Sequence, residues 1–280
     1  MNSPLLNLLW ETLQWGMAPA LLLFALTWLA AWKIDNWSIV DVVWSYGFAI
    51  LIALPFAVGA AAAGWSSLPS RWLDDPLLWL SAAMVLWSLR LGTHLGIRVL
   101  GHLDKEDGRY LRMREVHGKR MAWKMAIFYL QQAVALVVLM LPFYAASTDA
   151  EGQRAGAVHV AGLALFLAGL AFEATGDSQL ARFKADPANR GKVCDVGLWA
   201  WTRHPNYFGE FLIWLGFALL SFTPNLLGIP GLLCAGVILY LVTNVTGIPL
   251  TEQQLLTSKG DAYRDYQRRV SAFWPRPPRR

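Results

Sequence analysis

Seven stretches of the chain are apolar for long enough to cross the hydrocarbon core of a bilayer, which takes about 20 residues of helix. Such spans must satisfy their backbone hydrogen bonds internally, so a chain with several of them folds as a helical bundle in the membrane. We predict an all-α integral membrane protein, a single membrane domain over residues 1–280. The seven spans are expected at residues 13–32, 37–60, 77–100, 125–146, 157–175, 206–224 and 226–248.

The Lys and Arg residues predict how these spans are oriented. Twenty of the 24 fall in alternate connections and in the segment after the last span, and only two fall in the opposite loops. Basic residues of short loops stay on the cytoplasmic side. We therefore expect the N-terminus outside and the C-terminus in the cytoplasm, in a bacterial inner membrane or, in a eukaryote, the endoplasmic reticulum. The basic excess also suits anionic lipid headgroups; neither nucleic acid nor a protein partner is indicated.

Polar residues inside the predicted spans gather at one end. Ionisable groups are costly in hydrocarbon and usually face a protein interior or a wet cavity. Arg90, His94 and Arg98 recur at every fourth position, which places them on one helix face. A pocket open to the cytoplasm is therefore predicted. The other polar residues expected at that end of their spans are Asp41, Glu173, Asp177, Glu210 and Asn244.

The segment "WTRHPNYFGE" at residues 201–210 stands at the entrance of the sixth span. Pro205 suits the first turn of a helix, and the free backbone N–H groups that follow attract an anion. With Arg203 and His204 beside them, these groups resemble a phosphate seat. The competing interpretation is interfacial snorkelling and helix capping. One helix face would then present Asn206, Glu210 and Trp214.

Two charged loops offer further cations. The loop after the third span holds Arg109, Arg112 and Lys119, and it could equally be a solvated amphipathic helix. The loop before the sixth span holds Lys184, Arg190 and Lys192 among turn residues. No glycine-rich nucleotide motif, metalloprotease pair or serine hydrolase elbow is present, and five scattered His residues predict no metal site.

The sequence "GLWAWTRHPNYFGEFLIWLGFAL" resembles the signature of the membrane steroid 5α-reductases and their bacterial relatives. Further similarity lies in "LGIRVLGHLDKEDGRY", "FEATGDSQLARFK" and "AYRDYQRRVSAFWP", so the resemblance covers residues 77–280. It implies a seven-helix bundle that binds NADPH at the cytoplasmic side. It also implies reduction of the 4,5 double bond of a 3-oxo-4-ene steroid or a similar lipophilic enone taken from the bilayer.

The resemblance also implies roles for single residues. Asn206, Tyr207, Glu210 and Trp214 match positions that face the nicotinamide half of NADPH, and Tyr263 and Tyr266 match the segment that closes over it. The remaining cofactor contacts expected are Arg98, Arg109, Asp177, Lys184, Lys192, Arg203, His204 and Asn244.

The resemblance matches the residues that would act as the acid of the reaction less well than it matches the cofactor contacts. Hydride addition to an enone builds negative charge on the carbonyl oxygen, which needs a hydrogen-bond donor. The family's second-span carboxylate corresponds to Asp41, which could donate if burial keeps it protonated. No Tyr occupies the expected third-span position, and His94 lies within one residue of it; Tyr46 could share the role. Alternatively, Asp41 forms an ion pair with Arg90 or Arg98, and His94 makes an interhelical hydrogen bond.

Flat apolar walls for a steroid could come from Trp44, Trp87 and Trp214, although most of the 15 Trp residues suit membrane interfaces. Two other functions stay open. Membrane methyltransferases that bind S-adenosylmethionine share an R-H-P-x-Y-x-G-E stretch, and a non-catalytic sterol-binding protein needs no cofactor. Because S-adenosylmethionine is itself cationic at sulfur, the many basic residues favour NADPH.

Overall fold

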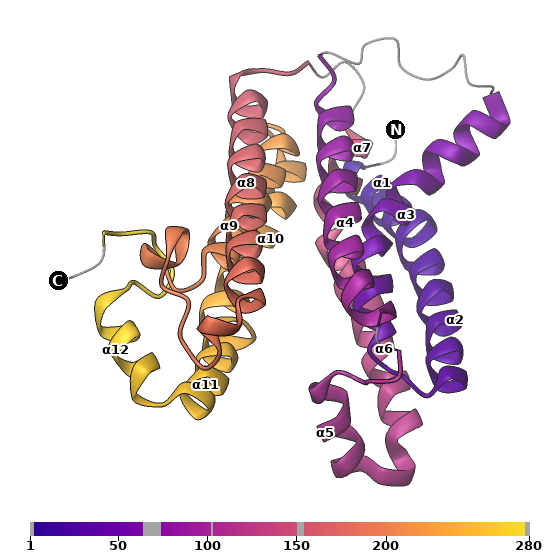
Figure 1. The fold of residues 1–280 in the computed structure, drawn as a ribbon. Helices are drawn as coiled ribbons and strands as arrows, with labels where there is room; N and C mark the ends of the chain where they lie inside the picture. Colours follow the sequence, from indigo (N-terminus) through magenta and orange to yellow (C-terminus); the bar gives the residue numbers. More distant parts are fainter. Residues whose placement is uncertain (1–2, 64–73, 102, 150–153, 278–280) are drawn as a thin grey trace. The chain divides into compact units, whose positions relative to one another are not determined.

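The computed structural model describes residues 3–63, 74–101, 103–149 and 154–277. The chain divides into two compact units, residues 1–155 with 223–230 and residues 156–222 with 231–280. Unit 1 holds α1 (Pro4–Glu11), η1 (Thr12–Met17), α2 (Ala18–Ile34), α3 (Ile39–Ala63), α4 (Pro76–Leu100), α5 (Gly108–His117), α6 (Met121–Leu139) and α7 (Leu141–Thr148). Unit 2 holds α8 (Ala157–Ala185), α9 (Pro205–Leu220), most of α10 (Ile229–Tyr240), α11 (Ile248–Lys259) and α12 (Asp261–Arg269) (Figure 1).

Six helical runs of the described residues are long and apolar enough to cross a membrane. The prediction of an all-helical, multi-pass membrane protein is thereby confirmed. The sixth predicted span forms α9, which at 16 residues is too short to be counted among them. The six runs are Pro4–Ile34, Ile39–Gly59, Pro76–Leu100, Gly108–Leu139, Ala157–Ala185 and Leu226–Lys259.

Several predicted boundaries were wrong. The first run begins at Pro4 rather than at residue 13, and the last continues to Lys259 rather than ending at residue 248. Two further differences concern the fifth and fourth spans. The fifth span does not end near residue 175, because α8 continues to Ala185 with Arg182 and Lys184 in its last turn. The added residues are mostly good helix formers, and cations at this end suit the helix dipole. Glu173 and Asp177 consequently lie inside the helix. The fourth span is interrupted at Met140, where α6 ends and α7 begins with a Pro in its first turn, a residue that cannot continue a helix without a break.

In unit 1, the turn between α2 and α3 is fastened to the segment that leads into α5. The backbone N–H of Trp37 donates to Glu106 at 2.8 Å. Arg114 of α5 bonds Glu106 at 2.9 Å and Asp35 at 2.7 Å. These bonds hold the start of α5 beside the first turn of α3, which contains Asp41.

In unit 2, α8 and α9 pack backbone to backbone. Gly162, Gly169 and Gly176 recur every seven residues on α8, as do Gly209 and Gly216 on α9. A Cβ on Gly169 would lie 2.6 Å from the Gly209 carbonyl oxygen, and one on Gly162 would lie 2.9 Å from that of Gly216. Small residues permit this approach, which is how helices associate in membranes. The pairs also show that the two helices run antiparallel.

Gly169→Ala should therefore destabilise unit 2. Overpacking of a tight contact costs about 1–3 kcal/mol, which lowers the unfolding midpoint by several degrees. Thermal unfolding of the purified protein in detergent measures the change. Gly236→Ala of α10 is the matched control, because its Cβ would meet nothing within 4 Å. The better helix propensity of Ala should there leave stability equal or higher. Equal midpoints for the two variants would contradict the backbone contact.

Candidate functional site

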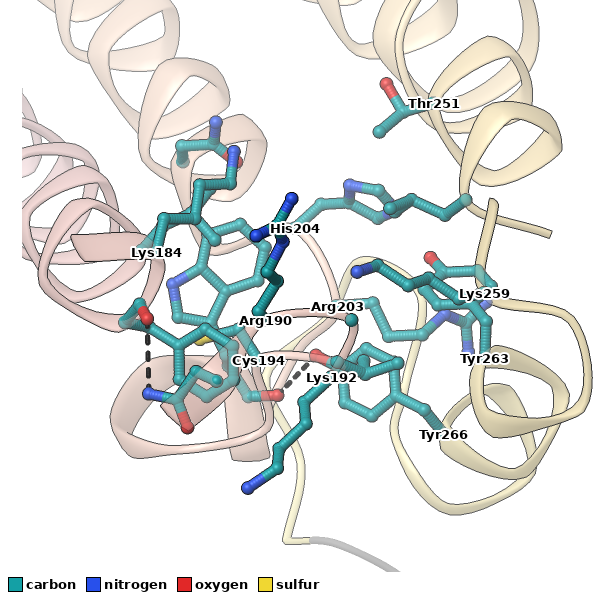
Figure 2. Close-up of a pocket in the computed structure, with 18 of the residues that line it drawn as sticks. Lys184, Arg190, Lys192, Cys194, Arg203, His204, Thr251, Lys259, Tyr263 and Tyr266 are labelled. Carbon is teal, nitrogen blue, oxygen red and sulfur yellow. Dashed lines mark hydrogen bonds between the residues drawn. The ribbon is translucent and has the colours of Figure 1, made fainter. Parts of the chain in front are cut away.

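A cavity of about 310 Å³ lies within unit 2 (Figure 2). Its walls come from the end of α8, the loop that follows, the start of α9, and α11 with α12. Pro205 lies in the first turn of α9, as predicted, and packs against Gly176, where an added Cβ would lie 3.1 Å from the proline ring. The close pairing of α8 and α9 therefore brings the 201–210 segment to the cavity.

The lining is strongly basic. Lys184 comes from α8, Arg190 and Lys192 from the loop, and Lys259 from the last residue of α11. None of the described residues in the lining is Asp or Glu, and none of these four cations forms an ion pair with a described residue. Uncompensated positive charge around a cavity attracts an anionic ligand such as a phosphate.

Aromatic rings cover much of the remaining wall. The rings of His204 and Tyr207 stack at 5.1 Å with an angle of 5° between them, and the Tyr207 hydroxyl lies 2.9 Å from that of Thr251. Tyr266 donates to the Trp199 carbonyl at 2.6 Å. The same wall of the cavity includes Trp199, Tyr263 and Cys194. Burial raises the pKa of the Cys194 thiol. Flat rings of this kind suit a planar heterocycle.

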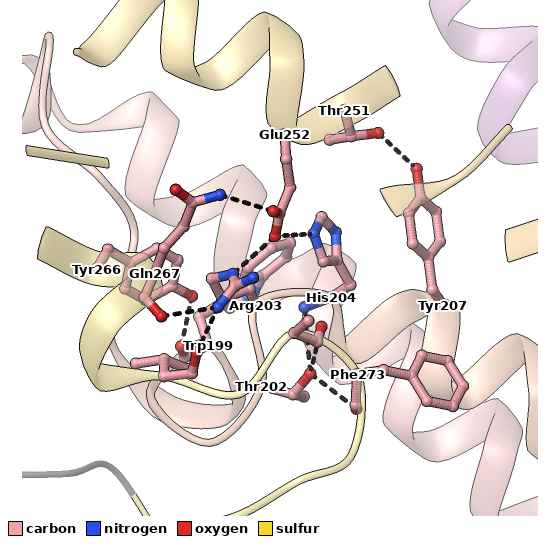
Figure 3. Close-up of polar contacts among 12 residues, drawn as sticks. Trp199, Thr202, Arg203, His204, Tyr207, Thr251, Glu252, Tyr266, Gln267 and Phe273 are labelled. Carbon is pink, nitrogen blue, oxygen red and sulfur yellow. Dashed lines mark hydrogen bonds and ion pairs between the residues drawn. The ribbon is translucent and has the colours of Figure 1, made fainter. Parts of the chain in front are cut away.

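Arg203 and His204 hold α11 and the end of α12 in place (Figure 3). The Arg203 Nε donates to Glu252 at 2.7 Å, and its Nη1 donates to the carbonyl oxygens of Gln267 and Val270 at 3.0 and 2.5 Å. The same Glu252 oxygen lies 3.2 Å from His204 Nε2, and Gln267 donates to the other oxygen at 2.7 Å. We call these five residues the Glu252 clamp.

The Glu252 clamp changes the interpretation of the predicted phosphate seat. Arg203 and His204 do line the cavity, but the positive charge of Arg203 is neutralised by Glu252 behind the wall. Burial lowers the pKa of His204, and the carboxylate of Glu252 only partly offsets this. A neutral imidazole and a neutralised guanidinium contribute little net charge, so the positive potential comes from the other basic residues of the lining. These are Lys184, Arg190, Lys192 and Lys259.

The other residues predicted in this unit divide into two groups. Asn206, Tyr207 and Tyr263 line the cavity, together with the two predicted lysines. Outside the lining, Trp214 is fully buried and donates to Glu210 at 2.8 Å within α9. Asn244 donates to Thr243 at 2.6 Å in a π-helical turn. The residues of this second group are Asp177, Glu210, Trp214 and Asn244.

In unit 1, Asp41 is at the centre of a polar cluster. Arg109 contacts one carboxylate oxygen at 2.5 Å, and the Tyr110 hydroxyl donates to the other at 2.9 Å. The expected alternative, an ion pair of Asp41, is present, but the partner is Arg109 rather than Arg90 or Arg98. The reason is that α5 begins at Gly108 and brings residues 109 and 110 back to the start of α3.

Asp107 fixes the Arg109 side chain. It accepts from Arg109 Nε at 3.0 Å and from the backbone N–H of the same residue at 2.9 Å, which caps α5. Arg98 lies 3.7 Å away. Partial burial would raise the pKa of Asp107, but the hydrogen bonds from Arg109 prevail and lower it. Sequence reasoning missed Tyr110, although it ends the "HLDKEDGRY" stretch that carries the resemblance.

The remaining predicted residues of unit 1 lie apart from this cluster. The Tyr46 hydroxyl lies 3.0 Å from that of Thr93, and His94 is exposed on α4. Trp44 and Trp87 both pack edge-on against Phe48, with ring centres 5.1 and 5.0 Å away. Because Trp87 is fully buried, its position is that of a core residue.

Glu252→Gln should loosen the wall formed by α11 and α12. The Arg203 and Glu252 side chains are only 10% and 13% exposed. Loss of one partner from a buried pair costs about 3–5 kcal/mol. We expect a lower unfolding midpoint and faster tryptic cleavage after Lys259 and Arg264.

The control for this variant is Asp261→Asn, which removes an ion pair whose carboxylate is 92% exposed. Exposed pairs contribute little to stability, so this change should leave the midpoint and the cleavage rate nearly unaltered. Similar behaviour of both variants would contradict the clamp.

Comparison with known proteins places the chain in a family. It is 29% identical over 221 residues to an uncharacterized protein of Schizosaccharomyces pombe, a match that covers 71% of this chain and 63% of the relative. The chain thus spans less than two thirds of that relative's length. No solved structure matches. The family described as "Protein of unknown function (DUF1295)" matches residues 27–270. The chain therefore belongs to this family, which is related to steroid 5α-reductase-like membrane proteins.

Proposed function

We propose that this protein uses NADPH to reduce the 4,5 double bond of a 3-oxo-4-ene steroid or a similar lipophilic enone. The observation that carries the proposal is the cavity of unit 2, where aromatic rings and four cations without an ion-pair partner among the described residues enclose about 310 Å³. The usual range for small-molecule sites is about 300–1,000 Å³. The family's relation to steroid 5α-reductase-like proteins and the "RHPNYFGE" motif support the same chemistry.

The cavity suits the two parts of a dinucleotide. Its four cations, Lys184, Arg190, Lys192 and Lys259, fit the phosphates. The stacked rings of His204 and Tyr207 fit a planar base. NADPH would supply the hydride. S-adenosylmethionine, the cofactor of the alternative methyltransferase, carries a positive sulfur that this lining would repel.

The acid chemistry falls to the Asp41 cluster. When a hydride reaches the β-carbon of an enone, the carbonyl oxygen gains charge, and a proton finally joins the α-carbon. The donor we favour for that oxygen is the Tyr110 hydroxyl, whose one proton is donated to Asp41 in this structure and would turn to the substrate oxygen when the enone binds. Arg109 would stabilise the negative charge that develops there. The proton that joins the α-carbon would come from water. His94 and Tyr46 are the second choices.

We also propose that α9 makes a seventh span, with the N-terminus outside and the C-terminus in the cytoplasm. The helix has 16 residues. At the rise of an α-helix it reaches about 24 Å, against a hydrocarbon thickness of about 30 Å. It nevertheless follows α8 from Gly176 to Gly162, and Ser221 and Phe222 extend the chain further. This arrangement puts the basic cavity at the cytoplasmic side, where the cofactor is available.

Replacing single pocket cations should weaken NADPH binding. We expect Lys192→Gln and Lys259→Gln each to raise the Kd about tenfold, equal to about 1.4 kcal/mol, with affinity falling as salt is added. Fluorescence titration of the purified protein measures this. Arg264→Gln is the control, because this cation of α12 is exposed, paired with Asp261 and outside the lining. Binding of S-adenosylmethionine in place of NADPH would replace the proposal with the methyltransferase alternative.

Turnover should depend on the Asp41 cluster independently of cofactor affinity. Asp41→Asn and Tyr110→Phe should each lower kcat about 100-fold or more with a 3-oxo-4-ene steroid, as loss of an acid catalyst does. The Kd for NADPH should stay unchanged, since no described residue of unit 1 lines the cavity. The absorbance of NADPH and identification of the saturated product measure turnover. Wild-type turnover in both variants would exclude the cluster from catalysis.

A further inference from the structure

A second cavity lies in unit 1, on the side of α2 that faces α6. It encloses about 330 Å³. Its lining is apolar apart from the polar atoms of Trp28 and Tyr129. The function proposed above does not involve this cavity. The lining residues are Leu21, Phe24, Ala25 and Trp28 of α2 with Ala126, Tyr129, Leu130 and Ala133 of α6.

One end of this groove is closed by tryptophan. The Trp28 indole N–H donates to the Ala122 carbonyl of α6 at 3.0 Å, and Trp28 stacks on Trp32 with ring planes 9° apart. Because α2 and α6 run antiparallel, the last turn of α2 and the start of α6 lie at the same end. Tryptophan is enriched where hydrocarbon meets the headgroups.

Cations gather just beyond the tryptophans. Lys33 lies in the last turn of α2, and Lys119 and Arg120 immediately precede α6. None of the three forms an ion pair with a described residue, while the nearby carboxylate of Asp35 is already bound by Arg114 at 2.7 Å. An apolar groove that ends in aromatic rings and then in uncompensated positive charge matches an acyl chain that ends in a phosphate.

We propose that the α2–α6 groove binds one anionic phospholipid, with an acyl chain between Ala25 and Ala126 and the phosphate at Lys33 and Arg120. A steroid enone has no negative charge for these cations, and a zwitterionic phospholipid offsets its phosphate with an ammonium group. Charge complementarity therefore selects the anionic lipid over both. This site is separate from the cofactor cavity and does not depend on the proposed reaction.

Native mass spectrometry of the purified protein with added phosphatidylglycerol or phosphatidylcholine tests the proposal. We expect one tightly retained phosphatidylglycerol and at least tenfold weaker retention of phosphatidylcholine. Ala126→Phe should fill the groove and abolish retention. Ala135→Phe is its control, because residue 135 is exposed. It also lies on the opposite face of α6, about 180° from residue 126.

The charges are tested separately. Lys33→Gln combined with Arg120→Gln should remove the preference for phosphatidylglycerol and leave the weak phosphatidylcholine signal. Lys124→Gln is the matched control, since residue 124 is exposed. It lies about 200° from Ala126 around the helix.

Two results would overturn the proposal. The first is equal retention of the two lipids by the wild-type protein. The second is displacement of the lipid by a 3-oxo-4-ene steroid with no effect of the double variant, which would make the groove a steroid site.

Discussion

The close contact between α8 and α9 is the constraint on which the candidate site depends. Glycines spaced by seven residues on both helices let the backbones touch, and this fixes the register as well as the distance. In that register, Pro205 at the start of α9 packs against Gly176 of α8. Because α8 continues for nine more residues beyond Gly176, its last turns lie beside the segment that precedes α9. Lys184 and the "RHPNY" segment therefore reach one cavity from two helices.

The motif builds the cavity as much as it lines it. Its Arg203 and His204 bind Glu252, and through that residue they position α11 and α12, which supply Lys259, Tyr263 and Tyr266. A motif of this kind is easily interpreted as a direct ligand contact. Here its charged members are satisfied by the clamp, and the uncompensated cations of the described lining come from the less distinctive loop and helix ends around it.

The sequence predicted the features that depend on local patterns. Apolar length predicted the helices in the membrane, and Pro205 predicted the start of α9. The regular spacing of the α8 glycines is also visible in the sequence and would have predicted a close helix–helix contact for α8. What the sequence did not reveal depends on distant partners. Glu252 is 49 residues from Arg203, and Tyr110 is 69 from Asp41, and no local periodicity links either pair. The extension of α8 was missed because polar residues ended the apolar run without ending the helix.

The separation of Arg203 and Glu252 along the chain also sets an order of events during synthesis. The two residues are 49 positions apart. At typical rates of translation, a segment of that length takes roughly 3 to 10 s, which is far longer than two adjacent helices need to pair. The α8–α9 hairpin can thus assemble while the other half of the cavity wall is still being made. The hairpin is therefore complete before Glu252 can bind Arg203, and the contact available to it at that stage is the backbone packing of its glycines.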